Sequence, residues 1–383
     1  MNTQLETNLI HAGEPKPGIM GAVNVPIFQS AMYEFSGESK DEFVRYIRYN
    51  NTPNHKAIEA KLAVLENGED ALVAASGMAA ISTALLSVLS KGDHLLVQDR
   101  LYGGTLSLLN MQFERMGIQF GAFDSQLNDD WENNVQPNTR AILVESIGNP
   151  LMDVLDLKRL VAFAKSKQII TLIDNTFASP INFRPLEIGI DVSLHSCTKY
   201  INGHSDIVAG AIISNMELIS AMRQTLINFG GTLDPHACYL LHRGMKTLAV
   251  RMRHQNESAG KLAAFLSTHP AVRIVNYPGL PSHPSFNVAS KLFDGYSGML
   301  SFELHGGETA AKAFMQHVNI PIIAPSLGGV ESLVTRPALT SHSRLSAEAR
   351  ERLGITAGLV RVSVGLENSD DLIHDFENAL GKM

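Results

Sequence analysis

The middle of this 383-residue chain alternates short apolar runs with amphipathic segments. Residues 157–167 (LKRLVAFAKSK) place apolar side chains at three- and four-residue spacing, which predicts an amphipathic helix. The apolar runs have the length of buried strands. We expect strands at residues 94–97, 118–123, 141–145, 169–174, 192–195 and 207–214. Strands that alternate with helices predict an α/β domain with a doubly wound, mainly parallel sheet.

The two ends of the chain follow other patterns. From about Lys246 onward, helical segments are separated by isolated strands, which predicts a smaller α+β domain. The first fifty or so residues have no regular period, so we expect an extended arm that needs a neighbouring chain to order it. The strands expected after Lys246 lie at residues 272–276, 299–304, 320–324 and 359–364. The predicted division is an arm over residues 1–54, an α/β domain over 55–245 and an α+β domain over 246–383.

Charge and cysteine content limit what the chain can bind. A formal net charge of −7, without a cluster of Lys or Arg, argues against a nucleic-acid or anionic-membrane partner. Cys197 and Cys238 are the only cysteines, so no multi-cysteine metal site can form, and no metal is expected. Residues 1–10 lack the basic and apolar regions of a signal peptide, which favours the cytoplasm. Residues 71–90 are uncharged but rich in Ser, Thr, Gly and Ala, which predicts a buried turn and helix and not a membrane span.

Residues 169–210 hold the polar side chains with the clearest chemical meaning. An apolar strand ends at Asp174, which brings a carboxylate to the sheet edge where open α/β folds bind ligands. Lys199 follows another short strand, and Ser196 and Thr198 come just before it. An imine-forming lysine needs a lowered pKa, and a pyridine nitrogen that stays protonated needs a carboxylate beside it. Lys199 and Asp174 match these two needs, and the two hydroxyls could hold a phosphate.

Backbone donors for an anion are expected near Ser76-Gly77-Met78, where a glycine opens a helix. Each of these features also has a simpler explanation. An Asp at the end of a strand often caps a helix, a serine before a glycine is ordinary capping, and a lone S-x-T-K arises by chance. Their order and joint spacing on a parallel sheet favour the catalytic interpretation.

Several longer motifs occur in a characteristic order. They read TNLIHAGEP, VNVPIFQSAMYEF, SGMAAI, LYGGT, IGNP, IDNTFASP, HSCTKYINGHSD, RGMKTLAVRM, SLGGVESL and LVRVSVGLE. With these motifs the chain resembles, over nearly its whole length, the Cys/Met-metabolism enzymes of the fold-type-I pyridoxal phosphate class. This class includes cystathionine γ-synthases, cystathionine γ- and β-lyases and methionine γ-lyases. The resemblance implies pyridoxal 5′-phosphate as cofactor, a small amino acid as substrate, and a homotetramer built from dimers that share active sites.

The resemblance also implies roles for individual residues. Lys199 would carry the cofactor as a Schiff base and shuttle protons, Asp174 would pair with the pyridinium nitrogen, and Tyr102 would stack on the ring and exchange protons. The implied cofactor contacts are Gly77, Met78, Ser196 and Thr198, with Tyr46 and Arg48 contributed by the neighbouring subunit. The implied substrate contacts are Asn149 and Arg361 at the α-carboxylate, together with Ser326, Glu331 and Arg45.

Three positions depart from the family pattern. Arg45 precedes Tyr46 where the cystathionine enzymes often have an acidic residue. Those enzymes commonly have an arginine after the Tyr-Gly-Gly motif for the distal carboxylate of cystathionine, whereas the matching region here reads Thr105-Leu106-Ser107. Because an unpaired buried carboxylate is costly, cystathionine is then an insecure substrate unless Arg45 supplies the charge. Gly104 stands where methionine γ-lyases typically have a cysteine, which argues against that activity without excluding it.

We therefore expect γ-elimination or γ-replacement on a sulfur-containing or O-activated homoserine-type amino acid. Methionine γ-lyase, cystathionine β-lyase and an enzyme for a non-cystathionine substrate are the alternatives. An NAD-dependent oxidoreductase would need a G-x-G-x-x-G turn after its first strand, which the chain lacks. A non-catalytic protein with the same fold is disfavoured by the joint presence of Lys199, Asp174 and Arg361.

Overall fold

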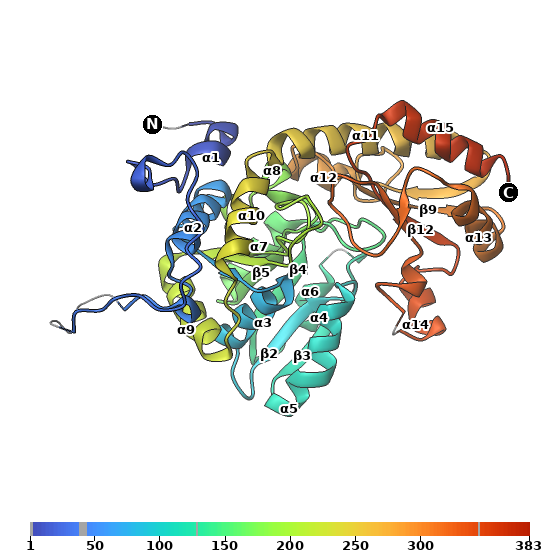
Figure 1. Cartoon of the computed structure of the whole chain (residues 1–383). Coiled ribbons are helices and arrows are strands. Elements are labelled where there is room, and N and C mark those ends of the chain that lie inside the picture. The colour runs from blue at the N-terminus through green and yellow to red at the C-terminus, as the bar shows by residue number, and fades with distance from the viewer. Residues whose placement is uncertain (1–2, 38–43, 128, 344) are drawn as a thin grey trace.

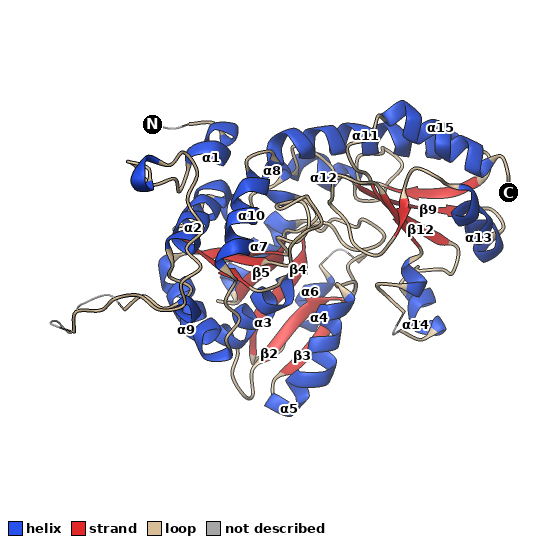
Figure 2. Cartoon of the chain, in the orientation of Figure 1, coloured by secondary structure: helices blue, strands red, loops and turns tan. Residues whose placement is uncertain are grey.

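The computed structural model describes residues 3–37, 44–127, 129–343 and 345–383. A seven-stranded sheet forms the centre of the larger part (Figures 1 and 2). Its strands are β1 (Asp70–Ala74), β2 (His94–Gln98), β3 (Gln119–Phe123), β4 (Thr139–Glu145), β5 (Ile170–Asp174), β6 (Val192–His195) and β7 (Gly210–Ser214). Their order is β1-β7-β6-β5-β4-β2-β3. The five strands from β6 to β3 are parallel, whereas β7 is antiparallel to both β6 and β1.

Helices cover both faces of this sheet, as its apolar strands require. One face packs on α3 (Gly77–Val88) and α9 (Met216–Phe229), and α4 (Gly103–Leu108) follows β2 beside α3. The other face packs on α2 (Pro53–Glu66), α7 (Leu157–Ser166) and α10 (Pro235–Met245). Helix α7 buries Leu157, Leu160, Val161 and Ala164 on one side, and Asp156 caps its first turn through Arg159 N at 3.2 Å.

A second sheet of five strands lies toward the C-terminus, at the right of Figure 1. Its strands are β8 (Val272–Asn276), β9 (Met299–Leu304), β10 (Ile322–Ile323), β11 (Leu333–Thr335) and β12 (Leu359–Ser363). They run in the order β10-β11-β12-β9-β8, and only β10 and β11 are parallel. Their apolar side chains pack with those of α11 (Leu248–Thr268), α13 (Gly307–His317) and α15 (Ser369–Leu380).

Shorter helical elements complete the described chain. They are α1 (Leu5–His11), η1 (Ile19–Gly21), η2 (Ile47–Tyr49), η3 (Leu109–Phe113), α5 (Glu114–Met116), α6 (Asp130–Asn134), α8 (Ser179–Asn182), η4 (Pro185–Ile188), α12 (Phe286–Leu292), η5 (Pro337–Leu339) and α14 (Ala347–Arg352). Within the described residues, no helix is long and apolar enough to cross a membrane.

The N-terminal segment runs along the outside of the larger part and then leaves it beside α2 and α9 (Figure 1). Its first helix is held by Lys61 of α2, whose buried Nζ donates to Leu9 O at 2.7 Å and Ile10 O at 3.2 Å. Further along, Met20 and Val23 are almost wholly exposed, at 101% and 92%. Large apolar side chains in such positions mark a surface suited to contact with another chain.

The predicted fold class is confirmed, with a mainly parallel first sheet and a smaller second sheet. Two strands were not predicted. Strand β1 occupies the start of the uncharged stretch 71–90, which we expected to be only a turn and a helix, because its pairing with β7 outweighs its Ala-rich local sequence. Strand β11 has three residues, too few for a periodic signal. The strands expected at 207–214 and 320–324 are shorter, at Gly210–Ser214 and Ile322–Ile323.

Candidate active site

A cavity of about 700 Å³ lies at the carboxyl ends of the parallel strands, between the two sheets. Open α/β sheets bind ligands at this edge. The predicted site residues that line the cavity are Gly77, Met78, Tyr102, Asn149, Asp174, Ser196, Thr198, Lys199, Ser326 and Arg361. They come from seven separate stretches of the chain, so the fold alone brings them together.

Asp174 is the last residue of β5, and a network of hydrogen bonds fixes its carboxylate. Its Oδ1 accepts the backbone N–H of Thr176 at 3.0 Å and also the Thr176 hydroxyl. The same hydroxyl oxygen accepts the backbone N–H of Ser196 at 2.8 Å, which links the ends of β5 and β6. Burial raises the pKa of Asp174, and the Thr176 hydrogen bonds and nearby His195 oppose that rise. Asp174 therefore lines the cavity and does not serve as a helix cap.

Lys199 lies in the turn that follows β6, and its amine is held from the other side of the cavity. Its Nζ donates to Ser326 Oγ at 2.7 Å. Burial, and next the positive charge of Arg361, lowers the pKa of Lys199 to about 8. The backbone of Ser326 has a φ of 124°, which residues other than glycine rarely adopt. This serine is therefore held in a strained conformation. A lysine with such a pKa is in part neutral near physiological pH, as nucleophilic and acid–base chemistry require.

The start of α3 and the turn that precedes Lys199 lie together at the cavity and could hold an anion. The N–H groups of Gly77 and Met78 belong to the first turn of this helix and have no intrahelical acceptor. A Cβ at Gly77 would lie 2.8 Å from Ser196 Cβ, so only glycine allows the helix to approach this closely. The Thr198 hydroxyl donates to Ala209 O at 3.2 Å and accepts Ala209 N at 3.0 Å, so it is already engaged. Backbone donors, Ser196 and the positive end of a helix dipole suit a phosphate.

Arg361 and Asn149 also line the cavity and could bind a second anion. Arg361 belongs to β12 of the second sheet, and its Nη1 donates to Asn149 Oδ1 at 2.9 Å. Its Nη2 donates to Ser326 O at 3.2 Å. Burial lowers the pKa of Arg361 to about 10, which leaves the guanidinium charged at neutral pH. Because a guanidinium has five N–H donors, the remaining ones can hold a carboxylate.

Tyr102 lies at the mouth of the cavity, and 46% of its surface is exposed. Its backbone N–H donates to Glu145 Oε1 at 2.6 Å. A Cβ at Gly103 would lie 2.3 Å from Ser341 O, so this glycine permits close contact between the tyrosine turn and the segment after η5. The ring therefore stands over an open space, where it could stack on a flat ligand.

Glu145 and Thr176 also line the cavity, and the sequence analysis did not single them out. Glu145, the last residue of β4, is the register partner of Asp174 and is buried. Burial and the neighbouring Asp174 raise the pKa of Glu145 well above its usual range. Thr176 holds Asp174 as described above. The signal for Glu145 was its position at the end of a predicted strand, where Asp174 also lies.

Four predicted site residues lie outside the cavity in this chain. Arg48 Nη1 donates to Ile227 O at 3.2 Å. Its Cζ lies 5.7 Å from the centre of the Tyr46 ring and 5.1 Å from the centre of the Tyr49 ring. Arg45 lies over the ring of Tyr33 at 5.4 Å. Glu331 accepts the Ser205 hydroxyl at 3.4 Å. A role in a neighbouring subunit's site stays a prediction for Tyr46, Arg48 and Arg45. The substrate contact expected of Glu331 also stays a prediction.

The residues present fit pyridoxal phosphate. The cradle of Gly77, Met78 and Ser196 matches the phosphate, Asp174 matches a protonated ring nitrogen, and the Lys199 amine matches an aldehyde. The three kinds of group that this cofactor needs, namely donors for an anion, a buried acid and a partly neutral amine, thus line the same cavity.

Comparison with known proteins identifies the family. The family model described as Cys/Met metabolism PLP-dependent enzyme matches residues 6–381. Cystathionine beta-lyase of Lactococcus lactis subsp. cremoris (strain MG1363) is 42% identical over 99% of this chain and 100% of its own length. L-methionine gamma-lyase of Fusobacterium nucleatum subsp. polymorphum is 39% identical over 99% of this chain and 98% of its own length.

A solved structure agrees in both fold and sequence. Cystathionine gamma synthase of Xanthomonas oryzae pv. oryzae, in complex with cystathionine, superposes with a TM-score of 0.96 and 36% identity. The match covers 100% of this chain and 99% of that one. The chain therefore belongs to the Cys/Met-metabolism family of pyridoxal phosphate-dependent enzymes, and pyridoxal 5′-phosphate is its cofactor.

Proposed function

We propose that the enzyme eliminates or replaces the γ-substituent of a sulfur-containing or O-activated homoserine-type amino acid. One observation carries the proposal: Ser326 is hydrogen-bonded both to Lys199, whose pKa is lowered to about 8, and to Arg361, which is itself hydrogen-bonded to Asn149. This arrangement supports a base at Lys199 beside a site for an α-carboxylate at Arg361 and Asn149. A base so placed can reach the α-proton of a bound amino acid.

The residues of the chain divide the work as follows. Arg361 and Asn149 would bind the α-carboxylate and so orient the α-carbon toward Lys199. The neutral Lys199 amine would remove the α-proton and, for γ-elimination, a β-proton as well. Tyr102 would deliver a proton to the leaving group at the cavity mouth. Gly77, Met78, Ser196 and Lys199 would hold the cofactor, and Asp174 would keep its ring nitrogen protonated. When bound, pyridoxal phosphate supplies an electron-withdrawing ring that stabilises negative charge at the α-carbon.

The cavity favours a substrate whose far end carries no negative charge. Among the described residues that line it, Lys199 and Arg361 are the only cations, and both contact Ser326. Val208, Pro325 and Leu339 add apolar surface. A second carboxylate would have to be paired from outside, and Arg45 of a neighbouring arm is the residue we expect to do this if active sites are shared.

β-Elimination is the second candidate. It is supported by the names of relatives, since the Lactococcus lactis protein at 42% identity is a cystathionine beta-lyase. Both reactions need the same base and carboxylate site, and they differ in which carbon–heteroatom bond breaks.

A substrate panel tests the proposal. Cystathionine, O-acetylhomoserine with cysteine, methionine and homocysteine would each be supplied to the cofactor-loaded enzyme. We expect 2-oxobutanoate or a replacement product, and we expect methionine or the O-acylated substrate to react at least as well as cystathionine. Pyruvate from cystathionine as the main product would establish β-elimination instead, and no product from any substrate would refute the proposal.

We further propose a homotetramer built from dimers that share active sites, located in the cytoplasm. The exposed apolar side chains of the arm support association, and the position of Arg48 outside its own cavity supports sharing. Cys197 and Cys238 are buried and unpaired, as is usual in a reducing compartment.

A further inference from the structure

Glu145 joins two loops that carry proposed substrate-handling residues. Its Oε1 accepts the backbone N–H of Tyr102 at 2.6 Å, and its Oε2 accepts the backbone N–H of Asn149 at 3.3 Å. The side chain is 6% exposed and lines the cavity beside Asp174. Burying a carboxylate next to another acid costs free energy. The hydrogen bonds from the two backbone N–H groups offset part of this cost.

The chain of contacts continues from Asn149 to the base. Asn149 Oδ1 accepts from Arg361 Nη1 at 2.9 Å, and Arg361 Nη2 donates to Ser326 O at 3.2 Å. Lys199 Nζ donates to the hydroxyl of the same serine at 2.7 Å. Glu145 thus links the Tyr102 loop, at the cavity, to the proposed carboxylate site and to Lys199.

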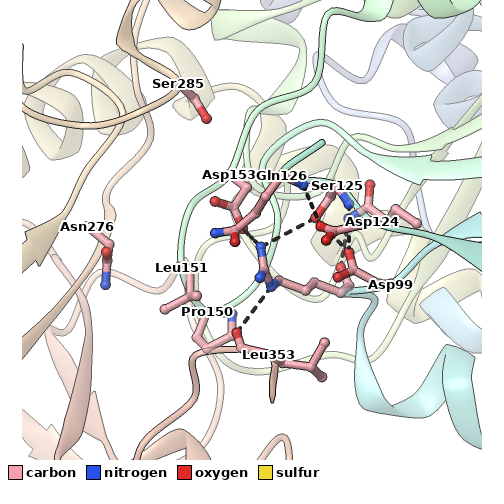
Figure 3. Close-up of polar contacts among 12 residues, drawn as sticks. Asp99, Asp124, Ser125, Gln126, Pro150, Leu151, Asp153, Asn276, Ser285 and Leu353 are labelled. Atoms are coloured by element: carbon pink, nitrogen blue, oxygen red, sulfur yellow. Dashed lines mark hydrogen bonds and ion pairs between the residues drawn. The ribbon is translucent and has the colours of Figure 1, made fainter. Parts of the chain in front are cut away.

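A second connection outside the cavity holds the same two loops. Gln98 Oε1 accepts Glu145 N at 2.9 Å, and Gln98 Nε2 donates to Arg100 O at 2.7 Å. The Arg100 side chain, 4% exposed, donates from Nη1 to Asp153 Oδ2 at 2.8 Å and from Nε to Leu353 O at 3.1 Å. Figure 3 shows Asp153, Ser125 and Leu353, which accept hydrogen bonds from the Arg100 guanidinium. The loops therefore have a firm outer support, and Glu145 sets their geometry at the cavity.

We infer that Glu145 is a positioning residue that couples the Tyr102 loop to the Asn149–Arg361 carboxylate site. The inference rests on the proposed function for what Tyr102 and Arg361 do. Through this coupling, a carboxylate bound at Arg361 fixes the place of the Tyr102 ring. The Tyr102 proton is then delivered only when a substrate is correctly bound.

Glu145→Gln tests the coupling with little change in size. A Gln side chain has one acceptor oxygen, so it can satisfy one of the two N–H groups and leaves the other without an acceptor. Asp375→Asn is the matched control. Asp375 is 7% exposed, accepts the backbone N–H groups of Asn319 and Ile320 at 3.0 and 2.9 Å, and lies far from the cavity lining.

The first measurement is hydrogen exchange of the cofactor-loaded protein, with and without a carboxylate ligand such as glycine. In the native enzyme, we expect glycine to slow exchange in peptides that contain Tyr102 as well as in those that contain Asn149. In Glu145→Gln, glycine should no longer protect the Tyr102 peptide, whereas Asp375→Asn should behave as the native enzyme does. Unchanged ligand protection of Tyr102 in Glu145→Gln would overturn the inference.

Kinetics supply the second measurement. Because an unsatisfied buried donor is costly, kcat/KM of Glu145→Gln should fall by about 10- to 100-fold, with Asp375→Asn near the native value. Glu145→Asp keeps both acceptor oxygens on a shorter side chain, so it should recover part of the loss. Equal losses in Glu145→Gln and Asp375→Asn, or no recovery with Asp, would mean a merely structural role. If Glu145→Gln does not fold, the Asp variant alone decides by its ligand protection of Tyr102.

Failure of the proposed function gives a different result. An enzyme that processes none of the panel substrates can still bind glycine, and the exchange pattern of the Tyr102 peptide then reports on the coupling alone. Loss of the coupling with normal turnover would overturn the inference and leave the function in place.

Discussion

The amine of Lys199 donates to the hydroxyl of Ser326 at 2.7 Å, although the two residues lie 127 positions apart in the chain. Ser326 holds this position in a strained backbone conformation, with a φ of 124°, while its carbonyl accepts from Arg361. One residue of the second part of the chain thus contacts both Lys199, the proposed base, and Arg361, the proposed carboxylate-binding cation. The contact also explains why the site exists only when the two sheets are packed together.

The pH dependence of cofactor attachment should report the pKa of Lys199. Burial, and next Arg361, lowers that pKa to about 8, so the amine loses its proton at lower pH than an ordinary lysine does. Only the neutral amine attacks an aldehyde. The rate of covalent attachment to the cofactor-free protein should rise as the pH passes through about 8 and then level off.

Absorbance change after mixing with pyridoxal phosphate at a series of pH values gives this rate. Arg361→Met removes the nearby positive charge and should move the midpoint to higher pH. A midpoint near 10.5 in the native protein, which is the pKa of an ordinary lysine, would contradict the lowered pKa.

Asp174→Asn should impair turnover much more than folding. The amide can keep the hydrogen bonds from Thr176, but it carries no charge to hold a proton on the ring nitrogen. Since a nearby opposite charge shifts a pKa by about 1–3 units, kcat/KM should fall by about 10- to 1000-fold. Steady-state assays, with thermal unfolding as the test of folding, check this. Asp156→Asn, at an exposed helix cap, is the control that should stay active. Native turnover in Asp174→Asn would refute the proposed role.

Gly77→Ala should weaken retention of the cofactor. The added Cβ would lie 2.8 Å from Ser196 Cβ and 3.0 Å from its Cα, so the helix and the turn must move apart. Overpacking of this kind costs about 1–3 kcal/mol, which corresponds to a rise in Kd of about tenfold or more.

Equilibrium titration of the cofactor-free variant with pyridoxal phosphate measures the change. Gly381→Ala provides the comparison, because its nearest atom would be Glu377 O at 3.4 Å in an exposed helix end. A Kd equal to that of the native protein would show that Gly77 does not shape the phosphate site.

Mixing two inactive variants tests whether neighbouring subunits share sites. Lys199→Ala should abolish turnover, and Arg48→Ala should weaken cofactor binding. If Arg48 serves the neighbouring site, a hybrid dimer has one site with both defects and one site with none, so activity returns. If it serves its own site, every site has one defect and no activity returns.

Co-expression with two affinity tags yields the hybrid for assay. Light scattering on the same sample gives the oligomeric state, and an active monomer would exclude shared sites. The control is Lys158→Ala, which changes an exposed lysine on α7 in place of Lys199. An oligomer made only of Lys158→Ala subunits should have the turnover of the native enzyme.

Local sequence patterns predicted the elements that carry the proposed cofactor-binding residues. Asp174 ends a strand of consecutive apolar residues, and Lys199 follows the short strand after it, so their place at the sheet edge follows from the parallel arrangement. The amphipathic helix over 157–167 was found at Leu157–Ser166 for the same reason. Strand β1 was missed because its pairing with β7, 140 residues away, decides its conformation.

The sequence by itself determined the family, the cofactor and most of the strands, because these depend on motifs and on periodicity along the chain. Only the tertiary structure decided which side chains meet. Arg361 and Asn149 are 212 positions apart, and Glu145 joins Tyr102 to Asn149 across two strands. Such contacts depend on the register of strands and on how the second sheet packs against the first. No local pattern records these distances, because hydrogen bonds form only when the whole fold places donor and acceptor within reach.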